Sequence, residues 1–298
     1  MLTQREQEIV NRWNQFVAKM PPGIRSLRDG VENIAREMNA NPPAIGAFHQ
    51  GVELRSGLGA DVAVPNGAGP FPVVVYLHGG GWVAGSLQSH CKLGMQFADA
   101  GYLTFNVDYR LAPENPFSAG FDDCVFAIKW AAENAPRWNG DGSRVAVGGD
   151  SAGGNLAAAS LAALAGDPVA SKLRAGLLLY GVYDFADAVR RAGAATPIEG
   201  MARAYLGAQY PAALDDPRVS PLRAVKPRAL PPCFVICGDQ DVLVDDSKLL
   251  ADALKRADIQ HELQIIEDMP HAFMQMNELS GCQRGLKLMF DFLARRMA

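Results

Sequence analysis

Six nearly continuous apolar runs constrain the fold of this chain more than any other feature of its sequence. They are PVVVYLHG (72–79), YLTFNVDY (102–109), RVAVGG (144–149), AGLLLYG (175–181), CFVICG (233–238) and HELQIIE (261–267). Helix-like stretches separate or follow them, at 88–100, 118–135, 152–165, 245–257 and 278–297. Apolar strands that alternate with helices are typical of a parallel sheet buried on both faces. Two earlier runs, VELRSG and ADVAVP, fit an antiparallel hairpin or edge, so we predict an α/β fold of about eight strands.

Composition excludes several classes of protein. The 298 residues suffice for one large domain, alone or with a small accessory layer. A formal net charge of −4 argues against a nucleic-acid partner, which would need a basic face. No stretch approaches ~18 uninterrupted apolar residues, so no membrane span is predicted. Charges in the opening MLTQREQEIVNRW stand where a signal peptide is apolar, and we therefore expect a cytoplasmic protein.

The five cysteines (Cys91, Cys124, Cys233, Cys237 and Cys282) form an odd set without C-x-x-C spacing. Two of them lie four residues apart in an apolar run and so share one side of a strand. We interpret them as buried thiols and not as a zinc site. A disulfide framework is not expected in a chain of this size.

The run VAVGGDSAGGN (145–155) changes sharply from a buried strand to a glycine-rich turn. A phosphate-binding loop would need a lysine after the glycines or a G-x-G-x-x-G spacing, and neither is present. Gly149-Asp150-Ser151-Ala152-Gly153 instead matches G-x-S-x-G, the nucleophile elbow, between a strand and the helix-forming NLAAASLAALA. The glycines leave room for a tight turn, and the strained serine stands at the positive end of a helix. Ser151 is therefore the predicted nucleophile.

A serine hydroxyl needs a base to take its proton, and the sequence offers five histidines. His49 and His90 precede the elbow and are expected in solvent. His261 fits a strand face, and His78 belongs to a separate glycine motif. His271 follows the last strand in EDMPHAFMQM, from where it can reach a serine at the carboxyl end of the sheet. His271 is therefore the predicted base.

The base needs a carboxylate that orients it, and CFVICGDQDVLVDD supplies four candidates just past a strand end. Asp245 and Asp246 suit the start of the following helix as cap and dipole partners. Asp239 suits the turn that leaves the strand. Asp241 is the best candidate, and the resulting order of serine, aspartate and histidine is typical of α/β-hydrolases.

The motif HGGGW (78–82) follows the strand PVVVYLHG and predicts an oxyanion hole. Acyl transfer places negative charge on the carbonyl oxygen, and losing one backbone donor there costs ~10²–10³ in rate. Consecutive glycines allow the backbone to approach a substrate closely. The amide of Ala152, the residue after the nucleophile, is the predicted second source of a hydrogen bond.

Together these motifs resemble the bacterial hormone-sensitive-lipase-like esterases, family IV of the α/β-hydrolase superfamily, with HGGG and GDSAG motifs. The matching stretches run from about residue 70 to 275 and are His78–Trp82, Asp108-Tyr109-Arg110-Leu111-Ala112-Pro113-Glu114, Gly149–Asn155, Asp241–Leu243 and His271-Ala272-Phe273. The resemblance implies that Ser151 is the nucleophile, Asp241 the orienting acid and His271 the base.

The resemblance also assigns the loop residues. Gly79, Gly80 and Gly81 span the oxyanion loop, with the second and third glycines as the favoured donors beside Ala152. Arg110 and Glu114 are expected to tie the core together beneath the site. Val242 replaces a proline that the family usually has after the aspartate, and Gly181 replaces one that often follows the tyrosine at 180.

The family further implies a helical cap, built from the N-terminus and an insertion after the strand that ends at Gly181. The N-terminal segment to about residue 38 is expected to be helical, with Thr3 and Glu6 spaced as a capping box; by itself it fits a surface helix or a lid equally well. The predicted division is a cap segment at 1–45, core at 46–184, a cap insertion at 185–216 and core at 217–298. The insertion is shorter than the family suggests.

The predicted function is that of a serine carboxylesterase acting on small, short-chain acyl esters through an acyl-enzyme, without metal or cofactor. A deacetylase, an amidase or a lactonase would use the same machinery. A non-catalytic receptor or adhesion protein on the same fold is the alternative from another class. The expected partner is a small-molecule ester, and the family adds the hypothesis of a homodimer through the free edge of HELQIIE.

Overall fold

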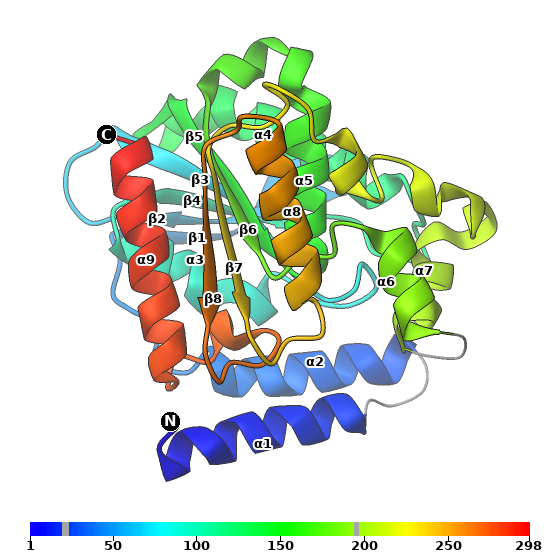
Figure 1. The fold of residues 1–298 in the computed structure, drawn as a ribbon. Helices are drawn as coiled ribbons and strands as arrows, with labels where there is room; N and C mark the ends of the chain where they lie inside the picture. The colour runs from blue at the N-terminus through cyan, green and yellow to red at the C-terminus, as the bar shows by residue number, and fades with distance from the viewer. Residues whose placement is uncertain (20–23, 194–196) are drawn as a thin grey trace.

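The sheet at the centre of the molecule has eight strands in the order β1-β2-β4-β3-β5-β6-β7-β8 (Figure 1). The computed structural model describes residues 1–19, 24–193 and 197–298. The strands are β1 (Ala47–Arg55), β2 (Leu58–Val64), β3 (Phe71–Leu77), β4 (Leu103–Asp108), β5 (Gly140–Asp150), β6 (Leu173–Leu179), β7 (Cys233–Gly238) and β8 (His261–Ile266). The first two form the predicted antiparallel hairpin, β2 pairs antiparallel with β4, and every pairing from β4 through β3 to β8 is parallel. The predicted fold is confirmed as an α/β-hydrolase fold with an eight-stranded, mostly parallel sheet.

Helices cover both faces of this sheet because successive strand residues point to opposite sides. Val73 and Val75 of β3 pack in one core with α4 (Ala119–Asn134), α5 (Ala152–Ala163) and α8 (Val244–Arg256). Val74 and Tyr76 pack in a second core with α3 (Cys91–Asp99) and α9 (Ser280–Arg296). Figure 1 shows the first helix group on one side of the sheet and the second group on the other. The continuous apolar runs are therefore explained by burial on both faces.

The segments predicted as cap material are helical where they are described. The N-terminal segment forms α1 (Gln4–Ala18) and α2 (Ile24–Met38), and the Thr3–Glu6 capping box is confirmed. The insertion forms α6 (Phe185–Ala192), α7 (Pro197–Leu206) and short 3-10 turns at Gly207–Gln209 and Ala212–Asp215. Residues 20–23 and 194–196, which fall in these two predicted segments, lie outside the described residues.

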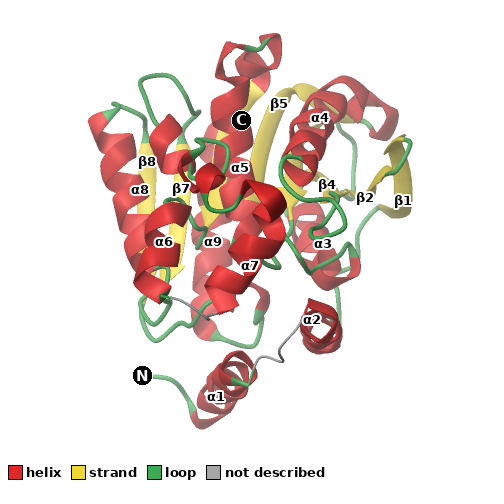
Figure 2. Cartoon of the chain, turned by 90° about the vertical axis from the view of Figure 1, so that its right-hand side faces the viewer, coloured by secondary structure: helices red, strands yellow, loops and turns green. Residues whose placement is uncertain are grey.

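The two helical segments lie at the same end of the sheet. Figure 1 shows α1 and α2 across the end toward which β7 and β8 point, and Figure 2 shows α6 and α7 beside them. This is the carboxyl end of the parallel strands, where α/β folds place their ligand sites. Among the described residues, no helix is long and apolar enough to cross a membrane.

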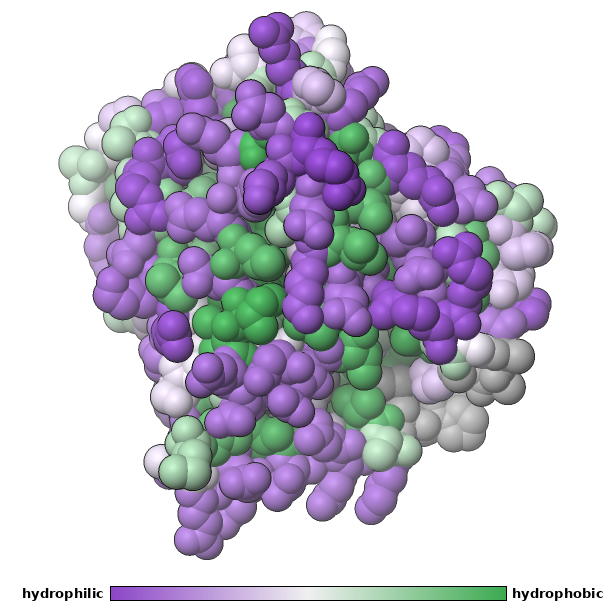
Figure 3. Space-filling model, in the orientation of Figure 1, coloured by the Kyte–Doolittle hydropathy of each residue, from purple (hydrophilic) through white to green (hydrophobic). Residues whose placement is uncertain are grey.

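The surface is mainly hydrophilic on the face drawn in Figure 3. Hydrophobic side chains gather near the middle of that face, in the region where Figure 1 draws β8 between α8 and α9. Strand β8 is the last strand of the sheet, and all but the final residue of His261–Ile266 are only partly buried. One edge of the sheet therefore carries a partly exposed strand in which the apolar residues Leu263, Ile265 and Ile266 alternate with polar ones.

Candidate active site

The sharp turn after β5 places Ser151 between the strand and α5. Ser151 has φ 53° and ψ −116°, a left-handed conformation that few non-glycine residues adopt. A Cβ on Gly149 would collide with the carbonyl of Gly153, and one on Gly153 would collide with the carbonyl of Leu77. Both glycines of the motif are therefore required by the close approach of backbone to backbone. Strain held at one serine in this way is a mark of functional turns.

Three predicted residues form one hydrogen-bonded chain. Nε2 of His271 lies 2.9 Å from Oγ of Ser151, and Nδ1 of His271 lies 2.7 Å from Oδ2 of Asp241. The other carboxylate oxygen of Asp241 accepts the amide of Leu243 at 2.8 Å. The residues come from three loops at the carboxyl ends of β5, β7 and β8, so the sheet brings them together. Both distances suit proton transfer from a serine to an oriented imidazole.

The electrostatic environment of His271 favours its protonated form. Burial alone would lower the pKa of His271, but the Asp241 carboxylate opposes this through its charge and its hydrogen bond. The more distant charge of Asp150 adds to the effect, and the net result is a raised pKa for His271. The Asp241 side chain has no exposed surface, whereas that of His271 is 26% exposed. The imidazole can therefore reach a substrate while its carboxylate partner is shielded from water.

The oxyanion loop orients two amides by fixing the carbonyls of their peptide groups. Nδ1 of His78 lies 2.8 Å from the carbonyl oxygen of Gly79, and burial, followed by the nearby charge of His90, lowers the pKa of His78 to about 4. The neutral imidazole therefore carries its proton on Nδ1 and donates to that carbonyl. The Gly80 carbonyl accepts the amides of Val83 (3.2 Å) and Ala84 (2.9 Å).

The N–H and C=O of a trans peptide point in opposite directions, so these anchors turn the amides of Gly80 and Gly81 away from the bonded side. Within residues 1–19, 24–193 and 197–298, neither amide donates a hydrogen bond. The amide of Gly79 differs, because it donates to Oδ1 of Asp150 at 3.0 Å. Gly79 therefore lies in the loop with its N–H used within the protein, and the second and third glycines remain the predicted donors.

The insertion contacts this loop directly. Trp82, the last residue of HGGGW, stacks between Phe185 of α6 (4.5 Å between ring centroids) and Tyr205 of α7 (4.8 Å). A Cβ on Gly81 would collide with the sulfur of Met201 on α7. Sequence reasoning did not find these contacts, because no motif links the glycine loop to residues more than a hundred positions later.

Some predicted roles near the site are wrong in part. Asp245 and Asp246 lie in the first turn of α8, where they suit the helix dipole, but no side chain caps this helix. Asp246 is buried, accepts the amides of Tyr183 and Asp184, and forms an ion pair with Arg191 of α6. His90, expected in solvent, is buried. In each case the sequence pattern of a helix start is correct, but a neighbouring segment covers the side chain.

Arg110 and Glu114 do not act together beneath the site either. Arg110 forms a two-point ion pair with the buried Asp123 of α4. Glu114 instead pairs with Arg28 of α2 at 2.7 Å, and its side chain is 59% exposed. The predicted structural role therefore holds for the first residue, while the second links the N-terminal segment to the core.

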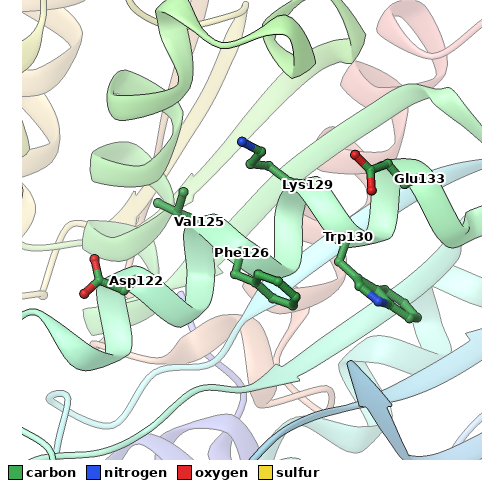
Figure 4. Close-up of a pocket in the computed structure, with 6 residues that line it drawn as sticks. All are labelled: Asp122, Val125, Phe126, Lys129, Trp130 and Glu133. Atoms are coloured by element: carbon green, nitrogen blue, oxygen red, sulfur yellow. The ribbon is translucent and has the colours of Figure 1, made fainter. Parts of the chain in front are cut away.

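All five cysteines are free, and four of them are buried. No group of three His, Cys, Asp or Glu side chains among the described residues is arranged to hold a metal ion. A surface hollow of about 350 Å³ lies along one face of α4, lined by Asp122, Val125, Phe126, Lys129, Trp130 and Glu133 (Figure 4). All six residues belong to that helix, and none is a predicted site residue.

Comparison with known proteins places this geometry in a family. Residues 74–275 match the family described as α/β-hydrolase fold. Carboxylesterase NlhH of Mycobacterium tuberculosis is 39% identical over 214 residues, which are 68% of this chain and 66% of that protein. The ethyl acetate hydrolase of Pseudomonas putida is 33% identical over 232 residues, 75% of this chain and 73% of that protein. The chain thus matches about two thirds of the length of NlhH.

Two solved structures extend the likeness to the entire chain. An esterase from Pyrobaculum calidifontis superposes with a TM-score of 0.86 and 29% identity over all of both chains. A hormone-sensitive lipase from a metagenome library superposes with a TM-score of 0.80 and 26% identity, covering 98% of each chain. With its HGGG loop, its elbow and its hydrogen-bonded serine, histidine and aspartate, the chain belongs to the hormone-sensitive-lipase-like esterase family of the α/β-hydrolase superfamily.

Proposed function

We propose that this protein is a serine carboxylesterase that hydrolyses small, short-chain acyl esters through an acyl-enzyme, with Ser151, His271 and Asp241 as its catalytic residues. One observation carries the assignment: the continuous chain from Ser151 Oγ to His271 Nε2 (2.9 Å) and from His271 Nδ1 to Asp241 Oδ2 (2.7 Å). The names of the two curated relatives, a carboxylesterase and an ethyl acetate hydrolase, support ester hydrolysis and a short acyl group.

The reaction proceeds in two halves. Oγ of Ser151 attacks the ester carbonyl carbon as Nε2 of His271 takes the hydroxyl proton. The resulting imidazolium gives that proton to the departing alkoxide, the C–O bond breaks, and an alcohol leaves an acyl-serine. His271 then takes a proton from water, whose oxygen attacks the acyl carbon. The imidazolium returns the proton to Ser151 as the acid is released. Asp241 holds the ring and balances its positive charge throughout.

The amides of Gly80, Gly81 and Ala152 are the proposed donors to the oxyanion. The carbonyl anchors of the first two, and the position of the third at the first turn of α5, support this role. Amides that are fixed before the substrate arrives need no reorganisation when charge develops on the carbonyl oxygen. Gly79 supports the loop through its bond to Asp150 and is not proposed as a donor.

The remaining parts of the proposal concern the whole chain. The segments 1–45 and 185–216 form a cap over cores 46–184 and 217–298, which the position of α1, α2, α6 and α7 at the carboxyl end of the sheet supports (Figure 2). Two copies of the chain pair through β8, the last strand of the sheet. The five free cysteines support a reducing compartment, the cytoplasm.

A series of p-nitrophenyl esters tests the function. We expect kcat/KM to be highest for acetate or butyrate and to fall with longer chains, and to exceed the values for p-nitroacetanilide and for a simple lactone. Replacing Ser151 with alanine should abolish turnover, because loss of such a nucleophile costs ~10⁶-fold. Retention of more than about a hundredth of the rate by Ser151→Ala would contradict the assignment. A faster reaction with the anilide or the lactone would move the protein to an amidase or lactonase.

A further inference from the structure

Asp150, which precedes Ser151 in the elbow, is a buried carboxylate with donors on several sides. Its side chain is 2% exposed. Oδ1 accepts the Tyr76 hydroxyl at 2.8 Å and the Gly79 amide at 3.0 Å, and Oδ2 accepts the side-chain amide of Gln275 at 3.1 Å. Nε2 of His90 lies 3.1 Å from Oδ1. We call Tyr76, His90, Asp150 and Gln275 the Asp150 cluster.

A carboxylate buried this deeply is retained only where donors replace its water. Burial alone would raise the pKa of Asp150. The charge and hydrogen bond of His90, together with the Tyr76 hydroxyl, more than offset this and lower it. Asp150 is therefore an anion within the protein, next to the residue that performs the proposed attack. The hydrogen-bond donors must offset the negative charge of Asp150, because the oxyanion, which is also negative, would form nearby.

The donors come from separate segments, two of which also contact each other, because Nε2 of Gln275 lies 2.8 Å from Nε2 of His90. Tyr76 lies on β3, Gly79 on the oxyanion loop, and His90 just before α3. Gln275 lies at the end of the 3-10 turn Phe273–Gln275, four residues after His271. One carboxylate thus connects the loop that carries the oxyanion donors with the loop that carries the base. A Cβ on Gly79 would press on the Asp150 carboxylate, so the contact also explains why this position is glycine.

Asp150 also acts on the base through its charge. The groups that face His271 are the Asp241 carboxylate from the loop after β7, the more distant Asp150 carboxylate from the elbow, and Tyr180 after β6, whose ring lies edge-on at 5.1 Å. Both carboxylates stabilise the imidazolium and raise the pKa of His271. Only Asp241 contacts the ring.

We propose that Asp150 is the positioning residue of this active site: through Gly79 and Gln275 its buried carboxylate sets the oxyanion loop and the His271 loop in register, and its charge supports the imidazolium formed during the reaction. The proposal rests on the proposed function. It concerns a residue that touches neither the substrate nor the reacting atoms.

The test compares two buried aspartates that are both replaced with asparagine, a side chain of nearly the same size. Asp150→Asn removes the charge and presents an NH₂ group to a ring of donors. Asp123→Asn is the matched control, since Asp123 is also buried but pairs with Arg55 and Arg110, outside the site. Rates with p-nitrophenyl acetate are measured from low to high pH and are normalised to the folded fraction from circular dichroism.

For Asp150→Asn we expect kcat to fall by up to about 10²-fold, the loss that a displacement of 1 Å can cause, while KM changes little. The acidic limb of the kcat/KM profile should move to lower pH, because His271 loses one of the charges that raise its pKa. Asp123→Asn should melt earlier but keep its rate per folded molecule and its pH profile.

The outcomes separate the two proposals. If Asp150→Asn keeps the wild-type kcat and pH profile, or if Asp123→Asn changes both to the same extent, the positioning role is overturned. If Asp150→Asn does not fold, Tyr76→Phe tests the same point, because it removes one donor from Oδ1 while leaving the ring in the core; an unchanged kcat in that variant also overturns it. Activity in Ser151→Ala would instead overturn the proposed function.

Discussion

At the scale of single residues, the pair of His271 and Asp241 links activity and stability in opposite directions. The pKa of His271 is raised in the folded protein, so its protonated form is favoured there. Its contribution to stability is present below the unfolded value near 6.5 and is lost as pH rises through the higher folded value. The base must be neutral to accept the serine proton. Activity is therefore gained over the pH range in which this contribution to stability is lost.

This coupling predicts the behaviour of two neighbouring aspartates. Asp241→Asn should lower kcat by about 10⁴-fold, because the imidazole loses the partner that fixes its tautomer and balances its charge. In the wild type, the rise of activity with pH has its midpoint above 6.5, the ordinary pKa of histidine, because the pKa of His271 is raised. In Asp241→Asn the residual activity should rise at a lower pH. The pH dependence of kcat/KM for p-nitrophenyl acetate measures both effects.

Asp239→Asn is the control for this prediction. Asp239 lies two residues away, just past the same strand, but it is exposed. We expect its rate and pH profile to match the wild type. A large loss in Asp239→Asn together with a small one in Asp241→Asn would reverse the assignment of the acid.

Residues whose role depends on local geometry could be predicted from the sequence, and residues whose role depends on tertiary contacts could not. The positions of Ser151, Asp241 and His271 follow from strand ends and from the glycines around them. His90 and Gln275 carry no such signal, because their contacts with Asp150 join segments from distant parts of the chain. The sequence indicates a role for Asp150 only by placing a polar residue in a tight glycine turn. Its carboxylate needs hydrogen-bond donors, and only the packed structure shows which residues supply them.

At the scale of secondary-structure elements, α2 is joined to the core by Arg28. Its Nε donates to the carbonyl of Val83 at 2.6 Å and its Nη2 to that of Ala112 at 3.0 Å. The same guanidinium pairs with Glu114. Val83 follows the oxyanion loop, so this contact connects the proposed cap with the active site. Charged donors to carbonyls contribute about 1.5–3 kcal/mol. Solvent reduces this here, because the Arg28 side chain is 32% exposed.

These contacts predict how the N-terminal helices respond to substitution. Arg28→Ala should speed cleavage by chymotrypsin within the first 38 residues and raise KM, because α2 loses both carbonyl contacts. Glu114→Ala should have a smaller effect, since it removes only a solvent-exposed ion pair. Limited proteolysis followed by mass spectrometry measures the rates.

Arg12→Ala is the matched control for Arg28→Ala. It removes an exposed ion pair with Glu37 between α1 and α2 but leaves the contacts of α2 with the core in place. Its cleavage rate should stay close to that of the wild type. Equal rates for Arg28→Ala and the wild type would show that Arg28 does not hold the segment.

The elements themselves were largely predictable, while their contacts were not. The run CFVICG coincides with β7 because a strand buried on both faces leaves a continuous apolar signature. The start of α8 also lies near its predicted position, but the contacts of Asp246 could not be predicted. Its partner Arg191 lies on the insertion, and nothing in the sequence near α8 indicates that contact.

At the scale of the whole molecule, the two edges of the sheet differ. The antiparallel hairpin of β1 and β2 forms one edge, and the partly buried strand β8 of the parallel region forms the other. The amide of Cys233 donates to the carbonyl of Gln260 and that of Asp239 to the carbonyl of Ile266. With the two-residue period of a ladder, the even-numbered residues of β8 bond to β7. The backbone groups of His261, Leu263 and Ile265 therefore face away from the sheet.

A row of backbone groups that face outward from an edge strand, next to the hydrophobic side chains gathered near β8, favours pairing with a second copy (Figure 3). We therefore expect the protein to have twice the mass of its 31.9 kDa chain in light scattering.

Leu263→Pro removes an outward N–H at the centre of this row and should give a monomer, because proline at an edge spares the bonds to β7. Leu263→Ala is the matched control: it loses the same side chain but keeps the N–H, and should remain a dimer. Pairing through β8 would be excluded if the wild-type protein had the mass of one chain or if Leu263→Pro stayed dimeric. Activity in the monomeric variant would show that one chain holds the complete site.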